Sequence, residues 1–265
     1  MMAQCKNCSL IQHTECMLYN TDMSSYDYLC PYCWVDPSQE LLLSRGTVII
    51  SPASILYQWQ QEIAKHVKEN TLKVFVYRGV EQHKFINPQD LADHDIILIS
   101  YEVLRRELGH LNVPHGASRR ALRYPQKFSV IPSPLSAIKW WRICLDEAQM
   151  VESVTSKAAE MALQLHTINR WCVTGTPIQK SVKDIYGLLL FLKYDPYDSR
   201  EWFHELLWKP LVNGNIDPMV SVLNQVMWRT SKKNVIEQLG IPMQETVIHK
   251  LQLSQVEKVF YETQR

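Results

Sequence analysis

The stretch WWRICLDEAQ, from Trp140 to Gln149, places two acidic residues directly after a short apolar run. The run is typical of a buried β-strand. A helix face follows, because apolar residues recur there at i, i+3, i+4 and i+7: Ala158, Met161, Ala162 and Leu165. Carboxylates at the end of a buried strand are costly unless they hold a cation, hold a proton or reach water. The stretch therefore predicts a strand and a helix joined by a turn whose acidic residues belong to a functional site.

The same order of strand and helix recurs along the chain. Four more apolar runs predict strands at Thr47–Ser51, Lys73–Tyr77, Asp95–Ser100 and Arg170–Gly175. After the first, Ser54 is predicted as an N-cap, and a helix face follows, formed by Ile55, Trp59, Ile63 and Val67. The last is followed by a capping box from Ser181 to Asp184. Repetition of this unit predicts an α/β fold with a parallel sheet and helices on both faces.

Ligands of such sheets bind at the carboxyl ends of the strands. Asp146 and Glu147 lie at one end, where the first acid can bind Mg²⁺ through water and the second can orient an attacking water. Acids that merely complement a helix dipole, worth about 0.3 to 1 kcal/mol, are an equal alternative on these residues alone. Thr174, Gly175 and Thr176 follow the next strand, and their hydroxyls can relay contacts between a nucleotide site and a nucleic-acid site.

The composition predicts a globular chain with one main domain and a small appendage. Of the 265 residues 46% are hydrophobic, and 28 Lys and Arg stand against 27 Asp and Glu. Any basic surface must therefore be local. Residues 109–139 contain five basic residues and no acid, which indicates either a DNA contact or a solvated insertion: Arg119, Arg120, Arg123, Lys127 and Lys139. No apolar run approaches the roughly 18 residues that a membrane helix needs, so we expect no membrane partner and an intracellular protein.

A cluster of potential zinc ligands opens the chain: Cys5, Cys8, His13, Cys16, Cys30 and Cys33. Pairs of cysteines two residues apart can hold one tetrahedral zinc ion at about 2.3 Å. A disulfide framework is the alternative, and the absence of a secretory signal disfavours it.

The spacing of these ligands resembles the PHD finger, a cross-braced module with two zinc ions. By that resemblance Cys5, Cys8, Cys30 and Cys33 hold one zinc ion, whereas His13 and Cys16 are half of a second site. Residues 1–38 are thus expected to form an incomplete PHD finger whose first cysteine pair lies upstream.

The rest of the chain resembles the first motor lobe of Snf-type DNA translocases of helicase superfamily two. The motifs that carry the resemblance occur in order: ISPASILYQWQQEI, ILISYEVL, WWRICLDEAQMVES and RWCVTGTPIQKSVKDIYGLLLFL. The match runs from Leu43 to Arg265 and implies a partial RecA-like lobe at 39–230 and a segment leading out of it at 231–265. The chain combines a PHD finger with these motifs and has Gln149 where most relatives carry His. In this combination it resembles translocases that are also RING-type ubiquitin ligases in DNA repair.

The resemblance implies ATP and Mg²⁺ as cofactors and a nuclear protein whose partners are duplex DNA and nucleosomes or histones. Asp146 and Glu147 are then catalytic, while a second set couples hydrolysis to DNA: Gln149, Thr174, Gly175 and Thr176. Residues of two turns would contact the DNA backbone: Ser51, Pro52, Ser54, Ser100 and Tyr101. A ubiquitin-conjugating enzyme would bind only through a RING, which this sequence lacks.

A motor of this class also needs the phosphate loop GxxxxGK[ST]. None of the eight glycines is followed by Lys, so we expect the loop upstream, and the second lobe with its arginine finger downstream. The chain alone is accordingly expected to be inactive. The alternative is a non-catalytic adaptor that binds chromatin or a partner protein.

Overall fold

The computed structural model describes residues 1–17, 27–36, 38–111, 131–151, 153–231, 234 and 245–264. Most of the basic residues of 109–139 lie outside these ranges, as does much of the segment 231–265. The chain divides into two compact units, Met1–Pro218 and Met219–Arg265, and each is described by itself.

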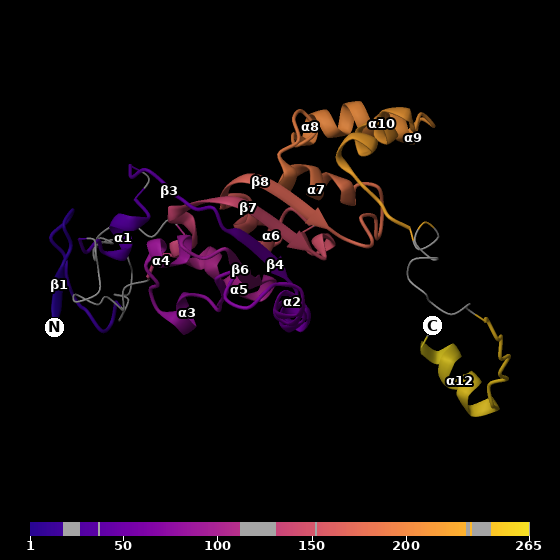
Figure 1. Cartoon of the computed structure of the whole chain (residues 1–265). Coiled ribbons are helices and arrows are strands. Elements are labelled where there is room, and N and C mark those ends of the chain that lie inside the picture. The colour runs from indigo at the N-terminus through magenta and orange to yellow at the C-terminus, as the bar shows by residue number, and fades with distance from the viewer. Residues whose placement is uncertain are drawn as a thin grey trace. The chain divides into compact units, whose positions relative to one another are not determined.

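A parallel sheet forms the centre of the first unit (Figure 1). Its strands are β3 (Leu42–Leu43), β4 (Thr47–Ser51), β5 (Val74–Tyr77), β6 (Ile96–Ser100), β7 (Ile138–Asp146) and β8 (His166–Val173). Strand β7 lies between β8 on one side and β3 and β4 on the other, and β6 and then β5 continue the sheet beyond β4. All of these pairs are parallel, which confirms the α/β fold.

Helices cover both faces of the sheet, as predicted. On one face α2 (Ala53–His66) packs Leu56, Trp59 and Ile63 against Ile49, Leu98 and Cys144. The larger core lies on the other face, beneath α5 (Tyr101–Glu107), α6 (Lys157–Gln164) and α7 (Asp184–Leu192). Shorter helical segments complete this part: α3 (Val80–His83), α4 (Pro88–Ala92), η1 (Leu108–His110), η2 (Pro134–Ala137) and η3 (Ala148–Val151).

Two predicted helix starts differ from the structure. Helix α2 begins at Ala53 directly after Pro52, so Ser54 lies inside the first turn with an exposed side chain and the N-cap prediction was wrong. Helix α7 begins at Asp184 instead of after Ser181. The Asp184 carboxylate nevertheless accepts hydrogen bonds from the backbone N–H groups of Gln179, Lys180 and Ser181 at 2.8 to 3.1 Å. The predicted acid therefore caps the turn that precedes the helix.

The helices after α7 are α8 (Arg200–Phe203), η4 (His204–Trp208), α9 (Lys209–Val212) and α10 (Asp217–Val226). The second unit holds most of α10 together with α12 (Gln255–Gln264). In the part of the chain that the structure describes, every helix is too short or too polar to cross a bilayer.

The amino-terminal residues form a small module with its own strands and helix. Strands β1 (Met2–Gln4) and β2 (Ile11–His13) pair antiparallel, and the helix α1 (Pro31–Trp34) follows. Five buried residues form the hydrophobic cluster of this module, and three of them are cysteines: Ala3, Cys5, Tyr28, Cys30 and Cys33. The fold of these residues therefore centres on thiols.

Candidate functional site

The strand register brings the predicted catalytic and coupling residues to one edge of the sheet. Asp146 is the last residue of β7 and pairs with Val173, the last residue of β8. Thr174 thus emerges beside the acidic turn that Glu147 begins. The two acids and the hydroxyl, distant in sequence, lie together as the parallel topology predicted.

Asp146 is hydrogen-bonded on three atoms. Its Oδ2 accepts a hydrogen bond from the indole Nε1 of Trp59 at 2.7 Å, and its Oδ1 accepts one from the backbone N–H of Glu147 at 3.0 Å. The hydroxyl of Tyr101 donates to its carbonyl oxygen at 2.9 Å. The residue is therefore fixed in position while its side chain stays half-buried.

A hydrogen-bonded chain connects the second acid to the neighbouring strand end. Gln149 donates through Nε2 to Glu147 Oε2 at 2.7 Å and accepts at Oε1 from the Thr174 hydroxyl at 2.6 Å. Thr174 in turn accepts from the backbone N–H of Thr176 at 3.1 Å. Each polar atom of the Gln149 side chain is thus used, so the amide orientation is set by its two partners.

The backbone at Glu147 is strained. Its φ of 50° lies in the left-handed region, which residues other than glycine rarely occupy. Such strain is characteristic of functional sites, where the surroundings hold an unfavourable conformation. By contrast, Gly175 has open space where a Cβ would lie and no positive φ, so its surroundings do not require glycine.

The acid pair suits a hard cation. Both residues supply carboxylate oxygens, the ligands that Mg²⁺ prefers, and both are half-buried, so water can reach them. A carboxylate has about four lone-pair positions, of which Asp146 uses one on each oxygen. Room therefore remains for a metal-bound water.

Three of the five residues predicted to touch DNA are buried. Ser51 and Ser100 pair directly across β4 and β6, so the two predicted turns lie side by side. However, Ser51, Ser100 and Tyr101 are 0%, 6% and 3% exposed, and Ser100 Oγ accepts from the backbone N–H of Val103 as a helix N-cap. Their side chains are therefore occupied inside the protein. Ser54 is exposed and Pro52 half-buried, and these two remain accessible to a ligand.

Sequence reasoning missed the part that Trp59 and Tyr101 play beside Asp146. Trp59 was predicted only as one member of an apolar helix face. A signal was present, because a tryptophan within a core usually finds an acceptor for its indole N–H. Tyr101 is buried, and burial raises the pKa of its hydroxyl well above the ordinary value, so it stays a hydrogen-bond donor.

Four cysteines form a second candidate site. One ligand atom from each of Cys5, Cys8, Cys30 and Cys33 lies within 4.8 Å of the others, and the sulfurs of Cys8 and Cys30 are 3.6 Å apart. Sulfurs that share a tetrahedral zinc ion at about 2.3 Å are separated by about 3.8 Å. The four thiols therefore fit a metal ion, as the spacing predicted.

His13 and Cys16 are outside this group. Both side chains are exposed, and no metal-ligand group of three or more among the described residues includes them. Residues 18–26, next to them in the sequence, lie outside the described ranges, so the half of a second site stays a prediction.

The environment of the cysteines alters their ionisation. Burial opposes ionisation of Cys5, yet hydrogen bonds from the backbone of Cys30, Cys8 and Asn7 outweigh it and lower the pKa of this thiol to about 7. Burial raises the pKa of Cys30 to about 12 and that of Cys33 further. A bound metal ion would deprotonate them, since a coordinating thiol loses its proton.

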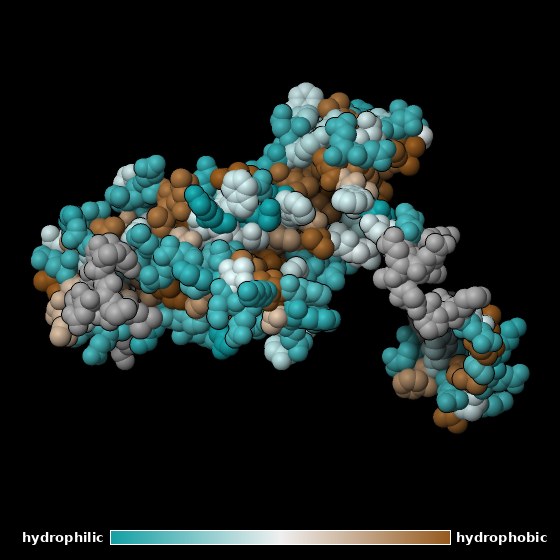
Figure 2. Space-filling model, in the orientation of Figure 1, coloured by the Kyte–Doolittle hydropathy of each residue, from teal (hydrophilic) through white to brown (hydrophobic). Residues whose placement is uncertain are grey.

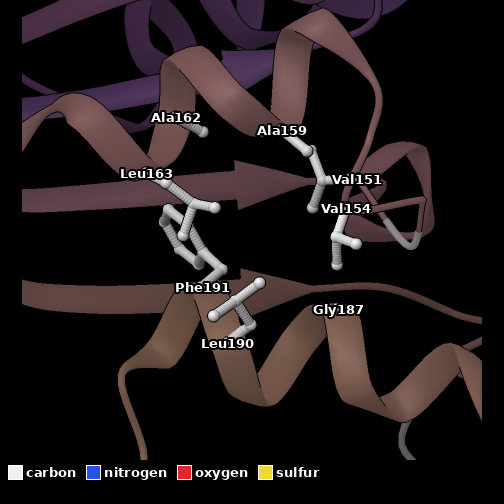
Figure 3. Close-up of a pocket in the computed structure, with 8 residues that line it drawn as sticks. All are labelled: Val151, Val154, Ala159, Ala162, Leu163, Gly187, Leu190 and Phe191. Carbon is white, nitrogen blue, oxygen red and sulfur yellow. The ribbon is translucent and has the colours of Figure 1, made fainter. Parts of the chain in front are cut away.

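The hollow behind the acidic turn differs in character from both sites (Figure 3). Its cavity volume is about 10 Å³, and it opens to solvent between α6 and α7 beneath the end of η3. All its lining residues are apolar or glycine: Val151, Val154, Ala159, Ala162, Leu163, Gly187, Leu190 and Phe191. No polar side chain is there to orient a nucleotide, so the polar edge of the sheet is the better candidate.

Comparisons with known proteins agree with this architecture. The E3 ubiquitin-protein ligase SHPRH of Mus musculus is 46% identical over 264 residues, which are 98% of this chain and 16% of the mouse protein. The DNA repair protein RAD5A of Arabidopsis thaliana is 29% identical over 84% of this chain and 21% of its own length. The chain thus spans only about a sixth to a fifth of these relatives.

A solved structure shares the fold. The SWI2/SNF2 ATPase core of Sulfolobus solfataricus in complex with dsDNA superposes with a TM-score of 0.52 at 21% identity, over 76% of this chain and 42% of that one. The family model of the SNF2-related domain matches residues 2–265. With that match over nearly its whole length, the chain belongs to the SNF2-related domain family.

Proposed function

We propose that this chain forms the later part of the first motor lobe of an ATP-dependent DNA translocase, residues 39–230, behind a zinc-binding finger at 1–38. Residues 231–265 lead out of the lobe in this proposal. The single observation that carries it is the hydrogen-bonded chain from Glu147 through Gln149 to Thr174. It connects an acid at one strand end to the hydroxyl at the next, within a member of the SNF2-related family.

In the proposed site Asp146 would hold Mg²⁺ through water, and such an ion would supply positive charge beside the phosphates of bound ATP. Glu147 orients the attacking water and takes its proton. Gln149 holds the Glu147 carboxylate toward Thr174, so a shift of the loop at Thr174, Gly175 and Thr176 would alter the direction of that carboxylate. Hydrolysis would be coupled to DNA through this contact.

DNA would lie along the turns that start α2 and α5. The likeness in fold to a SWI2/SNF2 core bound to dsDNA supports duplex DNA as the partner. Because Ser51, Ser100 and Tyr101 are buried, the contacts would come from Ser54, from Pro52 and from backbone N–H groups at the start of α2. Contacts of this kind hold phosphates without reading sequence, which suits a motor that moves along DNA.

The finger would hold one zinc ion through Cys5, Cys8, Cys30 and Cys33, with His13 and Cys16 able to contribute to a second. The names of the relatives indicate DNA repair and ubiquitin ligation for those proteins. We extend these to the whole protein that this chain represents: a nuclear chromatin protein that contacts histones or nucleosomes and, through a RING outside this sequence, a ubiquitin-conjugating enzyme.

The experiment that tests the motor assignment measures ATP hydrolysis with and without duplex DNA. The 265-residue chain alone, which contains no GxxxxGK[ST] loop, is expected to give no turnover. A chimera in which it replaces the aligned 264 residues of mouse SHPRH should hydrolyse ATP in a DNA-stimulated manner, and Glu147→Gln should abolish this. The unaltered mouse protein is the reference.

The outcomes separate the two readings of the chain. Turnover of the chain alone would overturn the requirement for the missing loop. A folded chimera that binds ATP but stays inactive beside an active reference would overturn the motor assignment and favour a non-catalytic adaptor that binds chromatin or a partner protein.

A further inference from the structure

Asp146 is held by both of the helices whose first turns are proposed to face DNA. Helix α2 reaches it through the side chain of Trp59, 87 positions earlier in the sequence. Helix α5 reaches it through Tyr101, 45 positions earlier. One hydrogen bond from each helix therefore ends on the same acid.

The two bonds act on different parts of the residue. Tyr101 donates to the main-chain oxygen and so holds the end of strand β7. Trp59 donates to Oδ2, so among the described contacts it is the side chain that fixes the carboxylate itself. Hydrogen bonds to an ionised acceptor are shorter and stronger than those between neutral groups, and the 2.7 Å distance fits that class.

The ring of Trp59 also has a packing role. It is half-buried against Ile49, Leu98 and Cys144, which fixes the position from which the indole N–H points. The packing of an indole ring does not by itself supply an acceptor for its N–H group. The fully buried Trp140, for example, has no partner for its Nε1 among the described residues. The orientation of Trp59 toward the acid is therefore a separate feature of the site.

We propose that Trp59 is a positioning residue for Asp146, which presents the carboxylate to a divalent cation and ties its orientation to helix α2. This inference rests on the proposed function, because it assigns the cation to Asp146. In this arrangement the indole occupies one lone pair of Oδ2 and the backbone N–H of Glu147 occupies one of Oδ1, so the other lone pairs of the carboxylate would be available to a metal-bound water. A displacement of α2 at its first turn would carry the indole with it and turn the carboxylate.

The test uses Mn²⁺ as the probe and the full 265-residue chain. Affinity for Mn²⁺ is measured from the electron paramagnetic resonance signal of the free ion, in wild type and in Trp59→Phe, which keeps an aromatic ring but removes the donor. Trp141→Phe is the matched control, because Trp141 is 45% exposed on β7 and makes no described contact with Asp146. Asp146→Asn marks the site.

We expect Trp59→Phe to weaken Mn²⁺ binding by about tenfold, the value of one hydrogen bond to a charged group. Trp141→Phe should bind like wild type, and Asp146→Asn should lose the Mn²⁺ binding assigned to this site. Thermal unfolding is recorded beside the titration, since a packing role alone would lower the melting temperature of Trp59→Phe without changing its affinity for Mn²⁺.

The Mn²⁺ affinities of the variants distinguish a wrong role for Trp59 from a wrong role for Asp146. Binding that depends on Asp146 but is equally tight in Trp59→Phe would overturn the positioning role and leave the metal site intact. Binding of Mn²⁺ that is unaffected by Asp146→Asn would overturn the metal role of Asp146, and the inference with it.

Discussion

The hydroxyl of Thr174 connects the residues that follow strands β7 and β8 at the candidate site. It donates to Gln149 and accepts from the backbone of Thr176, so both of its capacities are used. We predict that Thr174→Val, which keeps the shape but removes both bonds, lowers the free energy of unfolding by about 1 kcal/mol. Urea unfolding measures this.

Thr176→Val is the control for that change. The Thr176 side chain is exposed, and only its backbone N–H enters the described network. Its free energy of unfolding should stay within about 0.5 kcal/mol of wild type. Equal losses in the two variants would show that the hydroxyl of Thr174 has no special role in stability.

His83 gives the chain a pH-sensitive residue away from both sites. Its ring contacts those of Phe75 and Tyr77, and its Nδ1 has no partner among the described residues. Burial and the charge of Arg78 lower its pKa below the ordinary 6.5, although Glu107 acts in the opposite direction. The folded state therefore prefers the neutral ring, and protonation favours unfolding.

We predict that the neutral ring of His83 makes its full contribution to the free energy of unfolding above pH 6.5. This contribution is lost as the pH falls below that value. A group that binds a proton only in the unfolded state contributes a slope of at most about 1.4 kcal/mol per pH unit. His83→Phe should reduce the slope below pH 6.5 in urea unfolding, whereas the exposed His249→Phe should not. An unchanged slope in His83→Phe would contradict the prediction.

The two acids could be predicted from the sequence, but the side chains that donate hydrogen bonds to Asp146 could not. Asp146, Glu147, Gln149 and Thr174 follow from strand ends, because a parallel sheet brings those ends to one edge. The donor from Trp59 comes from a helix 87 positions away, and periodicity reports only that this residue faces the sheet. Its partner depends on the packing distance between α2 and β7, which no local pattern contains.

At the scale of elements, the strands were predictable and the helix starts were not. The five predicted strands all occur, and β4, β6 and β7 were the plainest because buried strands of a parallel sheet read as continuous apolar runs. The start of α2 was misassigned because Pro52 already fixes the first turn, so Ser54 falls within the helix. The pair β3 with β7 spans only two residues on each strand and leaves no periodic signal.

The finger is the element that depends most on a ligand. Its buried residues are largely the metal-ligand candidates themselves, and a structural zinc ion contributes on the order of 10 to 16 kcal/mol in small fingers. We predict one zinc ion for the site of Cys5, Cys8, Cys30 and Cys33, measured by elemental analysis of the purified chain. A chelator should then raise hydrogen exchange in β1 and α1 while β4, β6 and β7 stay protected.

Cys30→Ser provides the matched test, because Cys30 is fully buried within the cluster. It should lower the zinc content and give the exchange pattern of the chelated protein. Cys172→Ser, a thiol of the sheet outside the cluster, should keep its zinc. Exchange that rises equally in the finger and in the central strands would mean that the module does not unfold separately.

At the scale of the whole molecule, strand β8 is the exposed side of the sheet. Among the described residues it pairs only with β7. None of its residues is buried, whereas β4, β6 and β7 each contain fully buried ones. On the face seen in Figure 2, brown apolar residues are interspersed among teal polar ones, so burial of apolar side chains is incomplete there. An open edge with exposed apolar side chains is a template for pairing with another strand.

We predict that the purified chain associates with itself as its concentration rises, and that Ile168→Lys reduces this association. Ile168 is 54% exposed on β8, and a lysine on an edge strand disfavours pairing because its charge would have to be buried. Ile216→Lys is the control, since Ile216 is 55% exposed outside the sheet and gains the same charge. Sedimentation velocity over a range of concentrations measures the effect. If both variants associate less, added charge is the cause; if only Ile168→Lys does, the free edge of β8 is where the chains meet.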